Sequence, residues 1–183
     1  MITVLSSDPG ITNYGIAIMS VCNTSNVITY DIKYCGMLRN PIKDLLASNL
    51  SINLYEYMKE MRKYCLQYTP NHIVAERFMN RGVRQATGEK VNIMLGALMF
   101  YALVNKFQFK MHTASSWKVK LNKVLNMKIF VSKARDQGVT NHELDAACIG
   151  LYHACKEFDA DFCTCLNSLP KQMVFISRLR KAQ

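Results

Sequence analysis

Residues 2–22 read ITVLSSDPGITNYGIAIMSVC, two strand-like runs on either side of a turn. The runs at 2–6 and 14–22 are rich in Val, Ile and other strand-favouring residues, whereas Asp, Pro, Gly and Asn between them favour a tight turn. A third run of the same kind, VITYDIKYCGML at 27–38, follows the short turn NTSN. The first third of the chain therefore predicts three strands in an antiparallel meander.

The remaining sequence alternates helical and strand patterns. A helical period runs from about Pro41 to Tyr68 and ends before Pro70. The short apolar run HIVAERFM then predicts a strand that returns parallel to the first one. Further along, the patterns predict a helix from about Gly88 to Lys106, a strand at 107–113, and helical pieces at 114–125, 130–138 and 140–158. This order predicts an α/β fold.

Charge and length limit the function classes. The chain has 183 residues and carries 23 Lys and Arg against 13 Asp and Glu, for a formal net charge of +10. A basic excess of this size favours a polyanionic partner, and nucleic acid is the leading one. The length suits one domain over 1–183, with a core at about 2–155 and a basic C-terminal tail.

The cysteines indicate in which kind of cellular compartment the protein works. No secretory hydrophobic segment precedes the seven cysteines, so we expect their thiols to be reduced and mostly buried in the core. Reduced thiols are typical of an intracellular setting, such as a bacterial cytoplasm or a virus-infected cell. His153, Cys155, Cys163 and Cys165 could gather a zinc ion, but their spacing is not that of a common zinc finger, so we assign no zinc site there. The longest apolar run, at 93–104, is too short to span a membrane.

Three carboxylates stand at the edges of apolar elements. Asp8 follows the first strand, and Glu76 ends the fourth. The C-terminal ends of neighbouring parallel strands open on one crevice, so these two should meet. Thr140 and Glu143 have the spacing of a capping box, which places Asp145 near the start of an apolar helix with His142 on the same face. Converging carboxylates repel one another unless a divalent cation lies between them.

Each of these residues also has an ordinary structural explanation. Asp8 can stabilise its own turn, and Glu76 can pair with Arg77 or Arg81. His142 can be a surface residue of the helix cap, and Asp145 can simply favour the helix dipole. The occurrence of all of them together is what favours a metal site.

The motifs DPGITNYG, VAERFM and HELDAA resemble, in order and spacing, the three acidic motifs of the RuvC-type Holliday junction resolvases, which belong to the ribonuclease H-like superfamily. The resemblance spans about residues 2–155. It implies a five-stranded mixed sheet flanked by helices, in a homodimer that hydrolyses two opposed strands of a four-way DNA junction. The composition, rich in Asn, Lys and Met, is compatible with a viral or phage origin.

The resemblance also implies catalytic roles. Asp8, Glu76 and Asp145 match the metal-binding carboxylates for two Mg²⁺ or Mn²⁺ ions, which would activate water and stabilise the leaving 3′ oxygen. His142 matches the fourth ligand position, where many relatives have Asp, and an imidazole suits Mn²⁺ better than Mg²⁺. Lys118 in SSWKVK is the best match for a catalytic lysine beside the scissile phosphate, and Lys133 is a weaker one. Both can equally be solvated helix lysines.

The DNA contacts that we expect lie mainly after the fourth strand. Phe78 or Met79 could insert at the junction centre, although Phe78 can instead be a strand residue that packs on the core. The apolar helix at 88–106 is the candidate dimer surface, as in the family. The residues expected to bind phosphates are Arg77, Arg81, Arg84, Lys90, Lys118 and Lys133.

Three other functions compete with a resolvase. The first motif also resembles the phosphate loop of actin-like and sugar-kinase ATPases, but those proteins need two such domains and this chain has room for one. Another ribonuclease H-like nuclease, acting on RNA–DNA hybrids or flaps, would share the metal site. A branched-DNA-binding protein without catalytic activity is the third alternative. Dimerisation separates a resolvase from the other ribonuclease H-like nucleases, because symmetrical cutting needs two sites that face opposite strands.

Overall fold

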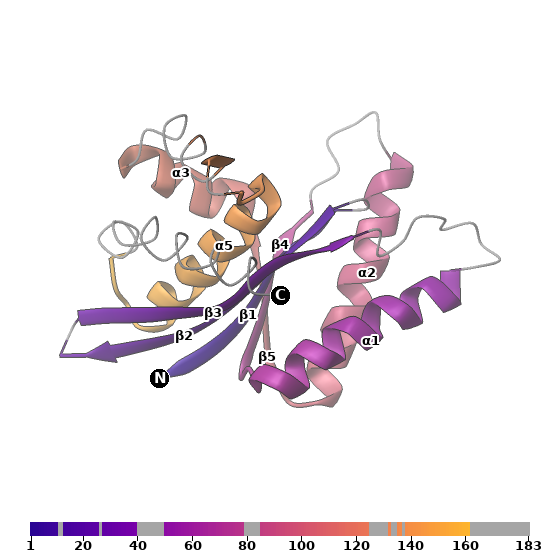
Figure 1. Cartoon of the computed structure of the whole chain (residues 1–183), viewed down its shortest axis with the longest axis horizontal. Coiled ribbons are helices and arrows are strands. Elements are labelled where there is room, and N and C mark those ends of the chain that lie inside the picture. The colour runs from indigo at the N-terminus through magenta and orange to yellow at the C-terminus, as the bar shows by residue number, and fades with distance from the viewer. Residues whose placement is uncertain are drawn as a thin grey trace.

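The computed structural model describes residues 1–10, 13–25, 27–39, 50–78, 85–124, 132, 135–136 and 138–161. A five-stranded mixed sheet with strand order β3-β2-β1-β4-β5 forms the centre of the fold. Helices α1 and α2 cover one face of the sheet, and α3 and α5 cover the other (Figure 1). The predicted fold class is therefore confirmed.

The N-terminal meander is confirmed. β1 (Ile2–Asp8) pairs antiparallel with β2 (Asn13–Thr24), which pairs antiparallel with β3 (Val27–Arg39). α1 (Leu50–Tyr68) then crosses over, and β4 (His72–Arg77) returns parallel to β1, as expected. β5 (Gln108–Thr113) extends the sheet parallel to β4. This topology places the C-terminal ends of β1 and β4 side by side.

Helix α2 (Gln85–Val104) begins three residues before the predicted start at Gly88, so the glycine lies inside its first turn. The helix ends at Val104 rather than Lys106, since Lys106 has a positive φ of 60° that leaves the helical region. Residues 40–49, where the first predicted helix would begin, lie outside the described residues. No helix within the described segments is both long and apolar enough to cross a membrane.

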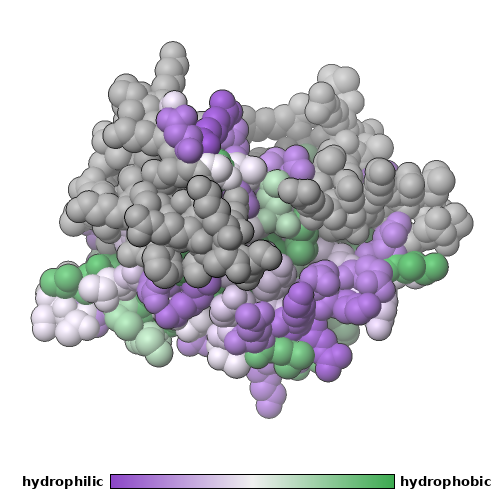
Figure 2. Space-filling model, in the orientation of Figure 1, coloured by the Kyte–Doolittle hydropathy of each residue, from purple (hydrophilic) through white to green (hydrophobic). Residues whose placement is uncertain are grey.

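Two hydrophobic cores result from the alternation of side chains along the strands. Leu5, Ile16 and Ile18 pack against α1 and α2 on one face. Val4, Ala17 and their neighbours pack on the other face against α3 (Ala114–Val124) and α5 (Asn141–Glu157). Four of the five described cysteines are buried, in agreement with their predicted place in the core. The outward side of α1 is mostly hydrophilic (Figure 2).

The position of α5 depends on two glycines. A Cβ on Gly15 of β2 would lie 2.1 Å from the carbonyl oxygen of His142, and a Cβ on Gly150 would lie 2.6 Å from Ser6 Oγ on β1. Neither contact is possible for a larger residue without a shift of the helix. One glycine from the sheet and one from the helix thus allow α5 to lie directly on β1 and β2.

Candidate active site

Three carboxylates from distant parts of the sequence meet at one end of the sheet. Asp8 ends β1 and is buried, Glu76 lies one residue before the end of β4, and Asp145 is in the second turn of α5. One ligand oxygen from each of the three lies within 4.8 Å of the others. The parallel pairing of β1 with β4 brings Asp8 and Glu76 together, as their positions at strand ends predicted.

The start of α5 brings the other two predicted residues to this place. Thr140 accepts a hydrogen bond from the backbone N–H of Glu143, and the Glu143 carboxylate accepts one from the backbone N–H of Thr140. This capping box, predicted from the sequence, fixes where the helix begins. The absence of a side chain on Gly15 then allows the backbone of His142 to lie against β2 beside Asp8.

Two basic side chains pair with two of the carboxylates. His142 Nδ1 lies 2.5 Å from Asp8 Oδ2, and this hydrogen bond raises the pKa of His142 against the opposing effect of burial. Lys118 Nζ donates to Asp145 Oδ2 at 2.7 Å. Burial lowers the pKa of Lys118, but the hydrogen bond and the surrounding carboxylates raise it overall. Lys118 is therefore a protonated ammonium at the edge of the carboxylate cluster.

Among the described residues, Glu76 has no cationic hydrogen-bond partner of this kind. Its Oε2 accepts a hydrogen bond from Trp117 Nε1 at 3.1 Å. Burial, and then the charge of Asp8, raise the pKa of Glu76 to about 7, although Lys118 opposes them. Burial also raises the pKa of Asp145, against the hydrogen bond from Lys118. The cluster thus holds more negative charge than its own side chains neutralise, which is the condition that a bound cation relieves.

The donor atoms suit a hard divalent cation. Carboxylate oxygens are the preferred protein ligands of Mg²⁺ and Mn²⁺, and three of them converge here. The imidazole of His142 is already in contact with one of these carboxylates. The arrangement could hold divalent metal through Asp8, Glu76 and Asp145, with His142 at its margin.

Some of the predicted DNA-binding residues lie in the part of the chain that the structure describes, and others lie outside it. Arg77 is exposed at the end of β4, and Lys90 is half-buried on α2. Phe78 is partly buried against the cluster of Ala75, Val91 and Leu95, which agrees with the alternative that this residue packs on the core. Four of the predicted DNA-binding residues lie outside the described residues: Met79, Arg81, Arg84 and Lys133.

Trp117 is a site residue that the sequence interpretation missed. It is the only tryptophan in the chain and is fully buried, yet its N–H reaches Glu76. The Lys118 ammonium lies 4.8 Å from the centre of the Trp117 ring. A lone tryptophan next to the candidate lysine, in an otherwise polar segment, was the available signal, because a buried indole N–H needs an acceptor.

No protein-family model matches the sequence, and no curated protein does either. Among solved structures, Thermus thermophilus RuvC in complex with a Holliday junction substrate matches with a TM-score of 0.65 at 16% identity, over 84% of this chain and 93% of that one. A second Thermus thermophilus RuvC structure matches with a TM-score of 0.64 at 17% identity, over 86% and 97%. The yeast mitochondrial Holliday junction resolvase Ydc2 matches with a TM-score of 0.56 at 14% identity, over 96% and 85%. The chain therefore has the RuvC-like, ribonuclease H-type fold that its motifs predicted.

Proposed function

We propose that this protein is a divalent-metal-dependent endonuclease that resolves four-way DNA junctions by paired hydrolysis of opposed strands. The observation that carries the proposal is the meeting of Asp8, Glu76 and Asp145 at the strand ends of a RuvC-like sheet. One of the similar structures holds a Holliday junction, and the net charge of +10 suits a DNA partner.

The metal would be held by Asp8, Glu76 and Asp145, with His142 as a further ligand. When bound, a pair of divalent ions supplies an activated water and stabilises the leaving oxygen of the phosphodiester. The protein residues provide oxygen ligands in fixed positions, because each stands on a regular element instead of on a loop. Mg²⁺ and Mn²⁺ are the proposed ions, and an imidazole ligand favours Mn²⁺.

Two residues of α3 support the carboxylates. Trp117 donates to Glu76 and orients its carboxylate, while Lys118 holds Asp145 and stays protonated. A fixed ammonium beside the carboxylates can also bind a phosphate oxygen and stabilise negative charge that develops during cleavage. We assign Lys118 this second role and Trp117 the positioning role alone.

Basic residues near the site would bind the flanking phosphates. Arg77 is the last residue of β4 and follows Glu76 directly, and its exposed side chain lies on the opposite face of the sheet from the Glu76 side chain, at the same end of the strand. Lys90 on α2, and the predicted contacts outside the described residues, would extend this surface. Met79 rather than Phe78 is the proposed wedge at the junction centre, because Phe78 packs on the core.

The outer side of α2 is the proposed dimer surface. From Ile93 to Val104 this helix is apolar all round, which is typical of a buried helix, yet Phe100, Leu103 and Val104 are exposed. Phe100 and Val104 also line a groove with Leu54 and Tyr55 of α1. A second copy that covers this surface would give two active sites related by a twofold axis, as symmetrical cutting requires.

Cleavage of a synthetic four-way junction with Mg²⁺ or Mn²⁺ tests the proposal, with Asp8→Asn as the inactive control. We expect paired nicks at symmetrical positions and little cutting of linear duplex. Equal cutting of linear duplex would rule out a resolvase. Preferred cutting of a hybrid or flap would identify another ribonuclease H-like nuclease, and junction binding without cleavage would identify a DNA-binding protein that lacks catalysis.

A further inference from the structure

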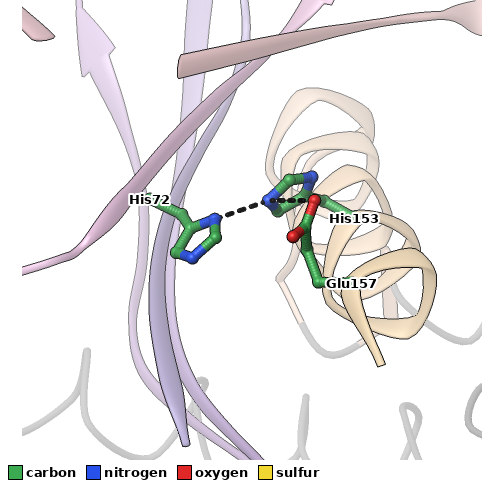
Figure 3. A group of neighbouring side chains, drawn as sticks. All are labelled: His72, His153 and Glu157. Atoms are coloured by element: carbon green, nitrogen blue, oxygen red, sulfur yellow. Dashed lines mark hydrogen bonds and ion pairs between the residues drawn. The ribbon is translucent and has the colours of Figure 1, made fainter. Parts of the chain in front are cut away.

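A second group of metal-ligating side chains lies between α5 and the sheet, away from the carboxylate cluster. His72 begins β4, and His153 and Glu157 are one turn apart near the end of α5 (Figure 3). The two histidines are 4% and 1% exposed. One ligand atom from each of the three residues lies within 4.8 Å of the others.

This group is separate from the candidate active site. Glu76 lies four residues after His72 on β4, which is about 13 Å along a strand. Asp145 lies eight residues before His153 on α5, which is about 12 Å along a helix. Glu76 meets Asp145 at one end and His72 meets His153 at the other, so α5 runs antiparallel to β4. The two spacings agree, so helix and strand stay in contact between these places. The layer between helix and sheet thus has a carboxylate cluster at one end and a histidine cluster at the other.

The histidines form a chain of hydrogen bonds. His153 Nε2 lies 2.9 Å from His72 Nδ1, and His153 Nδ1 lies 3.1 Å from His112 Nε2. Burial, followed by the neighbouring histidines and lysines, lowers the pKa of His153 to about 3. Burial, with Lys156 and Lys110 nearby, lowers the pKa of His112 to about 4, and burial lowers that of His72 despite the charge of Glu157.

We propose that His72, His153 and Glu157 form a zinc site that fastens the end of α5 to the start of β4. Imidazole nitrogen and carboxylate oxygen are Zn²⁺ ligands, and three protein ligands leave a fourth position for water. Glu157 Oε1 lies 3.9 Å from His153 Nε2, so the carboxylate is already beside the nitrogen that would bind. Two nitrogens on a tetrahedral zinc are about 3.3 Å apart, so the rings need to separate only slightly.

Zinc binding requires one change of tautomer, because the hydrogen bond between His72 Nδ1 and His153 Nε2 places a proton on one of the two nitrogens that would bind. On binding, the ring that carries this proton takes it on its other nitrogen. Binding through His153 Nε2 leaves its proton on Nδ1, where His112 Nε2 accepts it. Such an outer partner orients a ligating imidazole and increases its basicity. His72 would bind through Nδ1 and keep its proton on Nε2. Glu157, with a side chain 36% exposed, gives the ion a route from solvent and supplies a negative charge beside His72.

Zinc titration of the metal-free full chain, in competition with a chromophoric chelator, tests this site. Millimolar Mg²⁺ is present throughout to occupy the carboxylate cluster. We expect one zinc per chain and an affinity at least about tenfold weaker in Glu157→Gln, with a similar loss in His72→Gln. Because Glu157 lies at the exposed C-terminal end of α5, its variant should fold normally. Asp8→Asn serves as the matched control and should bind zinc like the wild type.

Cobalt substitution identifies the ligands. We expect visible absorption bands of a four-coordinate ion without the near-ultraviolet band of a thiolate ligand. The proposal would be overturned by no zinc bound at micromolar free metal, by unchanged affinity in Glu157→Gln, or by a thiolate band that assigns the metal to cysteines. Zinc binding that is lost in Asp8→Asn would also contradict it, because the ion would then belong to the carboxylate cluster. None of these results depends on nuclease activity.

Discussion

Replacing Glu76 with Gln should stabilise the metal-free protein while it abolishes cleavage. Glu76 is half-buried beside Asp8 and Asp145, and its pKa is raised from 4.5 to about 7. Gln keeps an oxygen that can accept the hydrogen bond from Trp117 Nε1, so the substitution removes the charge and little else. The variant therefore isolates the electrostatic effect of holding a carboxylate in this position.

The size of this stabilisation follows from the difference between the pKa of Glu76 in the folded and in the unfolded protein. Raising a carboxyl pKa from 4.5 to 7 corresponds to at most about 3.4 kcal/mol of lost stability. Glu76 is only partly buried, and solvent screening reduces this to about 1 to 2 kcal/mol. For a chain of this size, the Glu76→Gln variant should unfold about 2 to 8 °C higher than the wild type.

The pH dependence gives a sharper test. Because the folded pKa lies above the unfolded one, the charge destabilises the fold increasingly from pH 4.5 and fully above pH 7. Thermal unfolding in chelator should thus show a large gain for Glu76→Gln at pH 8 and almost none at pH 4.5. Added Mg²⁺ should raise the unfolding temperature of the wild type and leave the variant nearly unchanged.

Glu56→Gln is the matched control for this experiment. Glu56 is an exposed carboxylate on α1 that pairs with Lys59 at 3.3 Å, so its removal should change stability by less than about 0.5 kcal/mol. If Glu76→Gln gave no gain at pH 8, or the same gain at pH 4.5, the three carboxylates would not repel one another as the structure implies. The argument for a cation at the site would then lose its electrostatic basis.

Three further predictions concern the same fold. His142→Asp should retain cleavage and raise the ratio of Mg²⁺-supported to Mn²⁺-supported rates, because an oxygen ligand suits Mg²⁺; loss of activity with both metals would contradict this. Gly15→Ala should displace the start of α5 and reduce junction cleavage by about 100-fold with little loss of helix content by circular dichroism; wild-type rates would show that the close contact with His142 is unimportant. Leu103→Glu should convert a dimer to a monomer in light scattering, whereas Leu66→Glu, at a similarly exposed position on α1, should leave the dimer intact. Equal behaviour of the two variants would exclude the outer side of α2 as the dimer surface.

The sequence predicted those features that depend on local patterns. The meander, the crossover and the parallel return of β4 follow from alternating hydrophobicity and turn residues, and the capping box follows from Thr140 and Glu143 alone. Asp8 and Glu76 could be placed together because the ends of neighbouring parallel strands must meet. In each case, the information lies within a few residues of the feature or in a general rule of topology.

The features that the sequence did not predict depend on contacts between distant elements. Nothing near Trp117 in the sequence indicates that its N–H reaches Glu76, because the contact exists only when α3 packs beside β4. In the same way, His72 and His153 are 81 residues apart and meet only through the position of α5. Gly15, the second glycine of DPGITNYG, could be recognised as part of a motif. Only the structure shows why a glycine is needed there: the backbone of His142 leaves no room for a side chain.

The position of α5 determines the geometry of both candidate sites. The helix touches the sheet at Gly15 near its start and at Gly150 near its middle, and these contacts set its distance from β1 and β2. Asp145 lies between them, while His153 lies one turn beyond the second. A displacement at either glycine should therefore shift the carboxylate and histidine clusters together, although the two bind different metals in our proposals. Stability gained by fastening the end of α5 would in this way also hold Asp145 opposite Glu76.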